Sequence, residues 1–370
     1  MRIGTRGRAL LALGILAALV GPAAADTFLW GVAADYGVTP GTGQFAYRLT
    51  RFNADTGRLR FYPVEFPIPN LPFSFVSFPT AAPNGCVYWA VTAPVAQANP
   101  SFPPKIALAT FDPHDGGAYE MRSTGIDASS TFGPGSPNLL IADSARGYLL
   151  CTNTTGIDSV LYEINLSTSL AGTPMPILNG PTTWFSDDAV VATTVTYAAG
   201  FIYGVATDWS RSSSTLYRLD PTTPQDVIAA EASLDPVQRP LRLAGLADGR
   251  LFGFSGAALG LLTLQQYTFL TEDTVGVTSV GGSFDGSVVS GGTLVAGPDG
   301  NLYCSTQDGS YVLQIDPDTG LYTALGGFPG SNGVPGFSAL FLGPTAAPEP
   351  ATLALLGLGI AGVLARRRKR

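Results

Sequence analysis

An internal period is the feature of this 370-residue sequence that most constrains its fold. A glycine followed by a short apolar and aromatic segment recurs at Gly85, Gly147, Gly200, Gly249 and Gly300. Together with an N-terminal copy, these segments supply six equivalent positions: Trp30, Tyr88, Leu149, Tyr203, Phe252 and Tyr303. The spacings between neighbouring positions run from 49 to 61 residues. A period of this length is typical of chains that stack similar units side by side.

A second motif follows the first in each unit. It is an apolar strand that ends in Asp or Asn and is commonly followed by Pro, Thr or Gly, as in the segment that runs from Val312 to Gly320. Clear copies begin at Tyr47, Leu108, Leu161, Leu216 and Val312, and a degraded copy begins at Tyr267. Asp, Asn, Pro and Gly are the residues of tight β-turns. Two motifs that share one period indicate a genuine repeat.

Apolar and polar residues alternate within each unit, and this pattern predicts four short strands. In the last unit we expect them at Thr293–Ala296, Leu302–Thr306, Tyr311–Ile315 and Leu321–Leu325. The 45 glycines and 29 prolines suit a turn-rich all-β chain. Six units of four strands predict an all-β fold, a six-bladed β-propeller with four-stranded blades.

The two ends of the body predict how the ring closes. The first unit begins at its second strand, because nothing before Phe28 can serve as the first. Residues 337–342 resemble the first strand of other units, so we expect them to complete the blade that residues 27–33 begin. A seventh blade would need a unit hidden in the two longest gaps, which contain only enlarged loops. The body resembles propellers of many secreted bacterial proteins that carry a Leu-Tyr-x-Ile-Asp-Pro-x-Thr-Gly signature, and this implies the fold alone.

The N-terminal segment predicts export. Three arginines lie within residues 1–8, residues 9–20 are apolar, and the small residues Ala23 and Ala25 provide an Ala-x-Ala cleavage site. That order is typical of a secretory signal peptide. We therefore expect a signal peptide at residues 1–25 and a mature body at residues 26–344.

The C-terminal segment combines three elements. Pro348, Glu349 and Pro350 form a rigid tripeptide, and an apolar run follows from Leu353 to Ala365. This run is shorter than the roughly 20 residues of a typical membrane-spanning helix. A cluster of five cations, which favours the cytoplasmic side of a membrane, ends the chain: Arg366, Arg367, Arg368, Lys369 and Arg370.

Residues 345–370 resemble the PEP-CTERM sorting signal of Gram-negative bacteria. The resemblance implies transient membrane anchoring by a hydrophobic helix, processing by a membrane-embedded exosortase near the Pro-Glu-Pro motif, and delivery to the cell surface or the exopolysaccharide matrix. The same tail also bears the label of an ice-binding protein C-terminal domain, which is a label only. An ordinary C-terminal membrane anchor is the alternative.

The charge of the body argues against nucleic acid as a partner. Of 20 Lys and Arg residues, eight lie in the two terminal segments, whereas 26 of the 27 Asp and Glu residues remain in the body. The body therefore carries 12 cations and a formal net charge of −14. Phosphate backbones repel such a surface.

Catalytic residues are not evident in the sequence, so we name none. His114 is the only histidine, and it lies in a turn. The odd number of cysteines, Cys86, Cys151 and Cys304, and their places in the repeat predict three buried thiols without a disulfide.

Carboxylates in two turns could hold a calcium ion, although we expect neither a metal nor another cofactor. These turns are Asn53-Ala-Asp55-Thr-Gly and Asp316-Pro-Asp318-Thr-Gly. Neither has the spacing of an EF-hand, and a β-turn explains both.

Four other residues are candidates for ligand contact: an acidic pair, because a loop between units three and four can reach the mouth of a propeller, and two aromatic residues, because they lie outside the repeat positions. They are the acidic pair Asp187 and Asp188 and the aromatic residues Trp184 and Trp209. Aromatic faces outside the repeat positions could stack on sugar rings.

Two functions remain open after these observations. The first is a non-enzymatic surface or matrix protein whose propeller binds exopolysaccharide or a surface protein. The second is an exported hydrolase or lactonase that uses carboxylates, with or without Ca²⁺, in the axial funnel. Three or more carboxylate or Asn side chains converging on the central channel would favour the enzyme.

Overall fold

The structure is a computed structural model, and the account below covers the part of it that is well placed. The described residues are 28–35, 46–66, 77, 79–93, 105–113, 119–127, 138–152, 159–177, 195–208, 213–224, 227–256, 261–286, 289, 294–306, 311–327 and 337–342. Residues 27–344 group into one compact unit. The predicted signal peptide and sorting tail lie outside the described residues.

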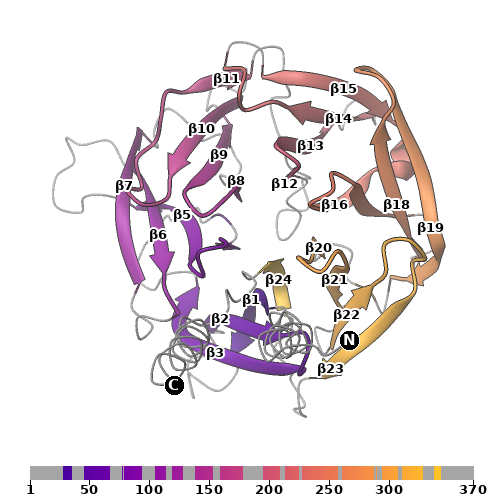
Figure 1. The fold of residues 1–370 in the computed structure, drawn as a ribbon, viewed down its shortest axis with the longest axis horizontal. Helices are drawn as coiled ribbons and strands as arrows, with labels where there is room; N and C mark the ends of the chain where they lie inside the picture. The colour runs from indigo at the N-terminus through magenta and orange to yellow at the C-terminus, as the bar shows by residue number, and fades with distance from the viewer. Residues whose placement is uncertain are drawn as a thin grey trace, which may run out of the picture. The chain divides into compact units, whose positions relative to one another are not determined.

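Six four-stranded antiparallel sheets make up this unit, and they are the predicted blades (Figure 1). The first three blades contain the following strands: β24 (Phe337–Leu342), β1 (Phe28–Asp35), β2 (Ala46–Asn53) and β3 (Arg58–Phe66) in blade one; β4 (Thr80–Ala81), β5 (Val87–Ala93), β6 (Lys105–Phe111) and β7 (Tyr119–Asp127) in blade two; β8 (Asn138–Ile141), β9 (Arg146–Thr152), β10 (Ser159–Asn165) and β11 (Met175–Ile177) in blade three.

The other three blades contain the following strands: β12 (Val195–Ala198), β13 (Phe201–Asp208), β14 (Ser213–Leu219) and β15 (Ile228–Leu234) in blade four; β16 (Pro240–Gly245), β17 (Leu251–Gly256), β18 (Leu261–Phe269) and β19 (Val275–Asp285) in blade five; β20 (Val295–Ala296), β21 (Leu302–Ser305), β22 (Tyr311–Ile315) and β23 (Tyr322–Gly327) in blade six. The strands of blade six match the prediction to within two residues at each end. One 3₁₀ turn, η2 (Pro236–Gln238), precedes β16.

The blades follow one another around a ring, with the first strand of each blade nearest the centre (Figure 1). Each central strand contacts the next one, in the order β4, β8, β12, β16, β20, β24 and back to β4. The six-bladed propeller that the sequence period predicts is therefore confirmed. Among the described residues, no helix is both long and apolar enough to cross a membrane.

Blade one combines the two ends of the propeller, as the sequence predicts. β24 pairs antiparallel with β1, and the register sets Leu29 opposite Leu342 and Trp30 opposite Phe341. This pairing covers the edge of β1 that would otherwise be exposed.

The core is divided among the junctions between blades. Among the described residues, six buried clusters form, and each combines side chains from two consecutive blades. Five of the repeated positions belong to these clusters and face the following blade, namely Trp30, Tyr88, Tyr203, Phe252 and Tyr303. The apolar surface that they bury is the main source of stability in such a ring.

Blade three corrects one equivalence that the sequence suggested. Leu149 faces the preceding blade, whereas Tyr148 lies in the cluster shared with blade four. Tyr148 is therefore the true equivalent of the other aromatic residues. The reason is that Gly147 is not the repeat glycine: it lies inside β9, whereas four other glycines adopt positive φ angles of 84° to 94° in the turn before the second strand, namely Gly85, Gly200, Gly249 and Gly300.

The three cysteines are free, as predicted. Cys151 and Cys304 are fully buried among apolar side chains, and burial raises the pKa of both thiols, that of Cys304 to about 12. Cys86 is only half-buried, which corrects the prediction that all three are buried. It directly follows the exposed turn at Gly85, so one side of its side chain remains accessible.

Candidate functional site

The ligand-contact residues that the sequence singled out, Trp184, Asp187, Asp188 and Trp209, lie outside the described residues, as does His114. Site geometry is therefore built from the turns, the axial cavity and the junctions between blades.

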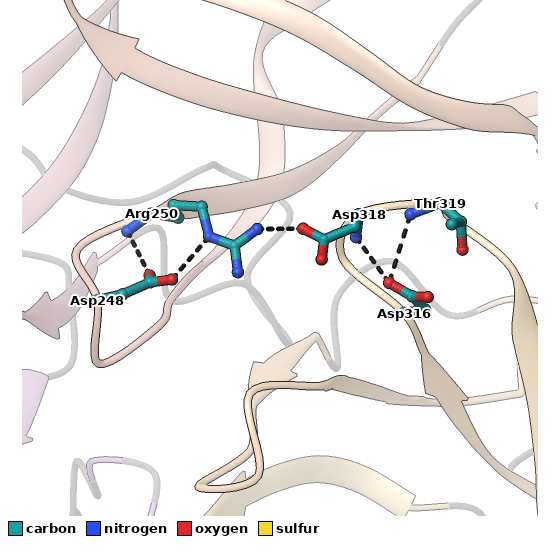
Figure 2. Close-up of polar contacts among 5 residues, drawn as sticks. All are labelled: Asp248, Arg250, Asp316, Asp318 and Thr319. Carbon is teal, nitrogen blue, oxygen red and sulfur yellow. Dashed lines mark hydrogen bonds and ion pairs between the residues drawn. The ribbon is translucent and has the colours of Figure 1, made fainter.

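In each of the two candidate calcium turns, a side-chain oxygen accepts hydrogen bonds from the backbone of the same turn. Oδ1 of Asp316 accepts hydrogen bonds from the backbone N–H of Asp318 at 2.8 Å and of Thr319 at 3.4 Å (Figure 2). These hydrogen bonds, the one from Asp318 first, lower the pKa of Asp316. Oδ1 of Asn53 accepts in the same way from Thr56 at 2.8 Å. Within the described ranges, no group of three or more His, Cys, Asp or Glu side chains is arranged to hold a metal ion.

Asp318 instead links two blades. Arg250, in the turn before β17, bonds through Nε to Asp248 Oδ2 at 2.8 Å and through Nη1 to Asp318 in the turn between β22 and β23 (Figure 2). The hydrogen bonds to Asp248 and Asp318 raise the pKa of Arg250. This part of the repeated turn motif therefore connects blade five to blade six.

The axial cavity has a volume of about 160 Å³ and is lined by the central strands of blades two to six. Its described lining is mostly apolar, and its polar side chains are Thr80, Thr196, Tyr197 and Arg242. A β-bulge between Pro240 and Leu243 displaces Arg242 from regular pairing. Burial lowers the pKa of Arg242 to about 10, so it remains a cation at neutral pH. No carboxylate or Asn side chain belongs to this described lining.

A second cavity, which we call the blade-four groove, opens between blades four and five. It is lined by Tyr203 and Arg218 of blade four and by residues 248–251 and 266–269 of blade five. Its volume is about 310 Å³. Aromatic rings, two arginines, Asp248 and Gln266 therefore meet in one concave site.

Arg218 is the central group of the blade-four groove. It lies opposite Tyr203 in the ladder between β13 and β14. Its guanidinium carbon lies 5.2 Å from the centroid of the Phe201 ring and 5.4 Å from that of the Phe269 ring. The Nε atom is buried and has no hydrogen-bond partner among the described residues. Burial raises the pKa of the Tyr203 hydroxyl, and the charge of Arg218 opposes this rise.

The position of Arg218 recurs in every blade, opposite the repeated aromatic residue. The six residues at this position are Arg51, Thr110, Glu163, Arg218, Gln266 and Gln314. Arg51 also lies over aromatic rings, 4.4 Å from the centroid of Phe28. Two blades on opposite sides of the ring therefore share an arginine stacked on aromatic side chains.

In blade six this position holds the neutral residue Gln314, whose side chain finds hydrogen-bond partners within the blade. Nε2 of Gln314 donates to Asp299 Oδ2 at 3.2 Å and to the Tyr303 hydroxyl at 3.0 Å. The Tyr303 hydroxyl donates to the same Asp299 oxygen at 2.7 Å. Burial alone would raise the pKa of Asp299, but the hydrogen bonds from Asn301 and Tyr303 outweigh burial and lower it. The carboxylate of Asp299, in the turn before β21, therefore accepts hydrogen bonds from both Tyr303 and Gln314.

The corresponding turn of blade four has no carboxylate. Ala198 pairs with Phe201, so the turn consists of Ala199 and Gly200, with φ angles of 49° and 90°. Ala199 precedes the repeat glycine, where Asp299 stands in blade six and Asp248 in blade five. The arginine of blade four is therefore left without the acceptor that Asp299 supplies in blade six.

Comparison with known proteins identifies the C-terminal segment. The family model of the PEP-CTERM protein-sorting motif matches residues 346–369. The chain thus combines a six-bladed propeller with a PEP-CTERM sorting motif. This motif implies an exported protein that an exosortase sorts, in a membrane-linked step, toward the cell surface.

No curated protein matches the sequence. Solved structures that resemble the chain include a glucose dehydrogenase (12% identity, 78% of this chain and 94% of that chain, TM-score 0.39). Others are the PQQ-bound aldose sugar dehydrogenase of Streptomyces coelicolor (12%, 69% and 82%, 0.41) and the hydrazine synthase of Kuenenia stuttgartiensis (10%, 76% and 81%, 0.44). At this level of similarity they say nothing about the activity of this chain.

Proposed function

We propose that the chain is a surface or matrix protein whose propeller is a non-enzymatic binding module for exopolysaccharide, with its site in the blade-four groove. One observation carries this proposal: Arg218 lines a cavity of about 310 Å³, and its guanidinium lies over the rings of Phe201 and Phe269. Aromatic rings beside a hydrogen-bonding group are suited to sugars, which have both apolar ring faces and hydroxyl groups.

The sorting motif supports this choice of ligand. We infer that the exosortase recognises Pro348, Glu349 and Pro350, that the C-terminal cations hold the tail in the cytoplasm, and that processing releases the propeller into the matrix. A propeller delivered there meets polysaccharide at high local concentration. A binding module needs only a groove and a means of delivery, and the chain has both.

Binding of the full-length chain in detergent to immobilised extracellular polysaccharides tests the proposal. The variant Phe269→Leu keeps apolar bulk but removes one ring face of the blade-four groove. We expect it to weaken binding about tenfold, which corresponds to a stacking contribution of about 1.4 kcal/mol. The matched control Phe61→Leu changes an exposed ring on blade one and should leave binding unchanged. Capture of proteins but of no polysaccharide would contradict the proposal.

A further inference from the structure

We propose that the blade-four groove selects carboxylate-bearing sugars, the uronate units of acidic polysaccharides, and that Arg218 is the group that reads the carboxylate. This inference rests on the proposed function and adds the class of sugar. It is carried by a difference between repeats of the same chain.

In blade six, two donors converge on one carboxylate oxygen of the protein itself. Tyr303 and Gln314 both donate to Asp299 Oδ2. In blade four, Tyr203 and Arg218 stand at the same two positions, but the turn offers Ala199. The blade therefore retains a pair of donors while the protein carboxylate is missing. A carboxylate from a ligand would complete the arrangement that Asp299 completes in blade six.

The chemistry of the guanidinium favours a carboxylate over a hydroxyl group. Arginine presents N–H donors in a planar fork that matches the two oxygens of a carboxylate. The Nε atom of Arg218 is buried and has no acceptor among the described residues, which leaves the two terminal nitrogens to meet a ligand in the groove. A carboxylate can bond to both terminal nitrogens at once through its two oxygens. A neutral hydroxyl group offers only one oxygen.

The other charged groups at the groove leave this role to Arg218. Arg250 also lines the groove, but it is bonded to both Asp248 and Asp318. Asp248, the acidic residue of the lining, is in turn engaged by Arg250. Arg218 is therefore the cation whose hydrogen-bonding capacity remains for a ligand. Because the mature body carries a formal charge of −14, it repels polyanions at long range, and binding depends on this short-range contact.

The aromatic neighbours hold the fork in place. The rings of Phe201 and Phe269 lie on the guanidinium at 5.2 Å and 5.4 Å and restrict its orientation. Because the side chain of Arg218 is already ordered in the free protein, binding costs less side-chain entropy. The site is thus prepared for a planar anion carried on a ring with apolar faces.

Binding of the full-length chain to polygalacturonate tests this inference, with dextran as a neutral polymer and polyglutamate as a carboxylate polymer without sugar. Arg218→Gln is suited to folding because glutamine stands at this position in blades five and six. We expect it to weaken binding to polygalacturonate at least tenfold. Arg218→Lys should lose most of that affinity too, because an ammonium group cannot make two parallel hydrogen bonds. The matched control Arg60→Gln removes the same charge from an arginine stacked on Tyr62 and should bind normally.

A measurement on the unaltered protein covers the case in which the variants fail to fold. Methyl esterification of polygalacturonate removes the carboxylate charge and should weaken binding as much as Arg218→Gln does. Equal affinity for the esterified and free polymers, or for dextran, would overturn the carboxylate inference while leaving polysaccharide binding intact. Equal loss in Arg60→Gln would show a bulk charge effect and overturn it as well. Stronger binding to polyglutamate than to polygalacturonate would assign the site to a protein ligand, and binding to none of the polysaccharides would defeat the proposed function too.

Discussion

The junction between blades six and one and the junction between blades four and five are built from the same repeat, yet only one is closed. At the first, Tyr303, Gln314 and Asp299 satisfy one another. At the second, Tyr203 and Arg218 face a cavity. The two junctions differ in the turn, with Asp299 in blade six and Ala199 in blade four, and opposite the tyrosine, where Gln314 corresponds to Arg218. A repeat protein can thus create a candidate site by omitting an internal partner.

The largest expected change in stability comes from removing the acceptor at the junction between blades six and one. Asp299→Ala removes the acceptor of the Tyr303 hydroxyl, and Tyr303 is only 1% exposed. An unsatisfied buried hydroxyl should lower the free energy of unfolding by about 1–2 kcal/mol. Chemical denaturation measures this change, and an unchanged midpoint would show that the network does not stabilise the junction.

The pH dependence of the same network provides its control. Because the pKa of Asp299 is lowered in the folded protein, its contribution is present above the unfolded pKa of about 3.8 and is lost as the pH falls through the folded value. The stabilities of the wild type and of Asp299→Asn should therefore converge in acid. A constant difference between pH 7 and pH 3 would contradict this assignment.

A smaller effect should separate the two equivalent tyrosines. Tyr303→Phe deletes a hydroxyl that donates one hydrogen bond and accepts another, and should cost about 1 kcal/mol. Tyr203→Phe deletes a hydroxyl at the open junction and should change stability by less than about 0.5 kcal/mol. Denaturation curves of the two variants provide the comparison, and equal costs would remove the distinction between the junctions.

The smallest effect concerns the ion pair between blades five and six. Asp318→Ala breaks the contact with Arg250, but the side chain of Asp318 is 73% exposed. Exposed pairs contribute about 0.2–1 kcal/mol and are screened by salt. Denaturation at low and high salt should therefore show a small difference that disappears at high salt. A difference that persists would mean that the pair is better shielded than its exposure indicates.

Much of the fold could be predicted because the repeat carries it. The missing first strand of unit one and the extra strand at residues 337–342 together predicted the closure by β24. The error in blade three has a local cause: Gly147 resembles the repeat glycine in sequence, but the turn ends earlier and Tyr148 takes the aromatic position. A single glycine does not determine which residues of a strand face a given blade, because a shift of one residue moves every side chain to the opposite face of the sheet.

The candidate site was harder to predict, since it depends on a departure from the repeat. The position that holds Arg218 could have been compared among the six units, and the arginines at residues 51 and 218 would then have stood out. The cavity itself could not have been found in that way. It depends on how blades four and five pack against each other, and the spacing of motifs does not report packing.

The pairing of β24 with β1 also sets a time order. β1 is among the first strands of the body to be synthesised, and β24 is the last. At typical synthesis rates of about 5–20 residues per second, roughly 15 to 60 seconds separate the two. During that interval β1 has an open edge, which is available to wrong partners. The sorting motif begins at residue 346, four residues after β24 ends. The strand that closes the ring and the motif that directs sorting therefore lie in the same short stretch of newly made chain.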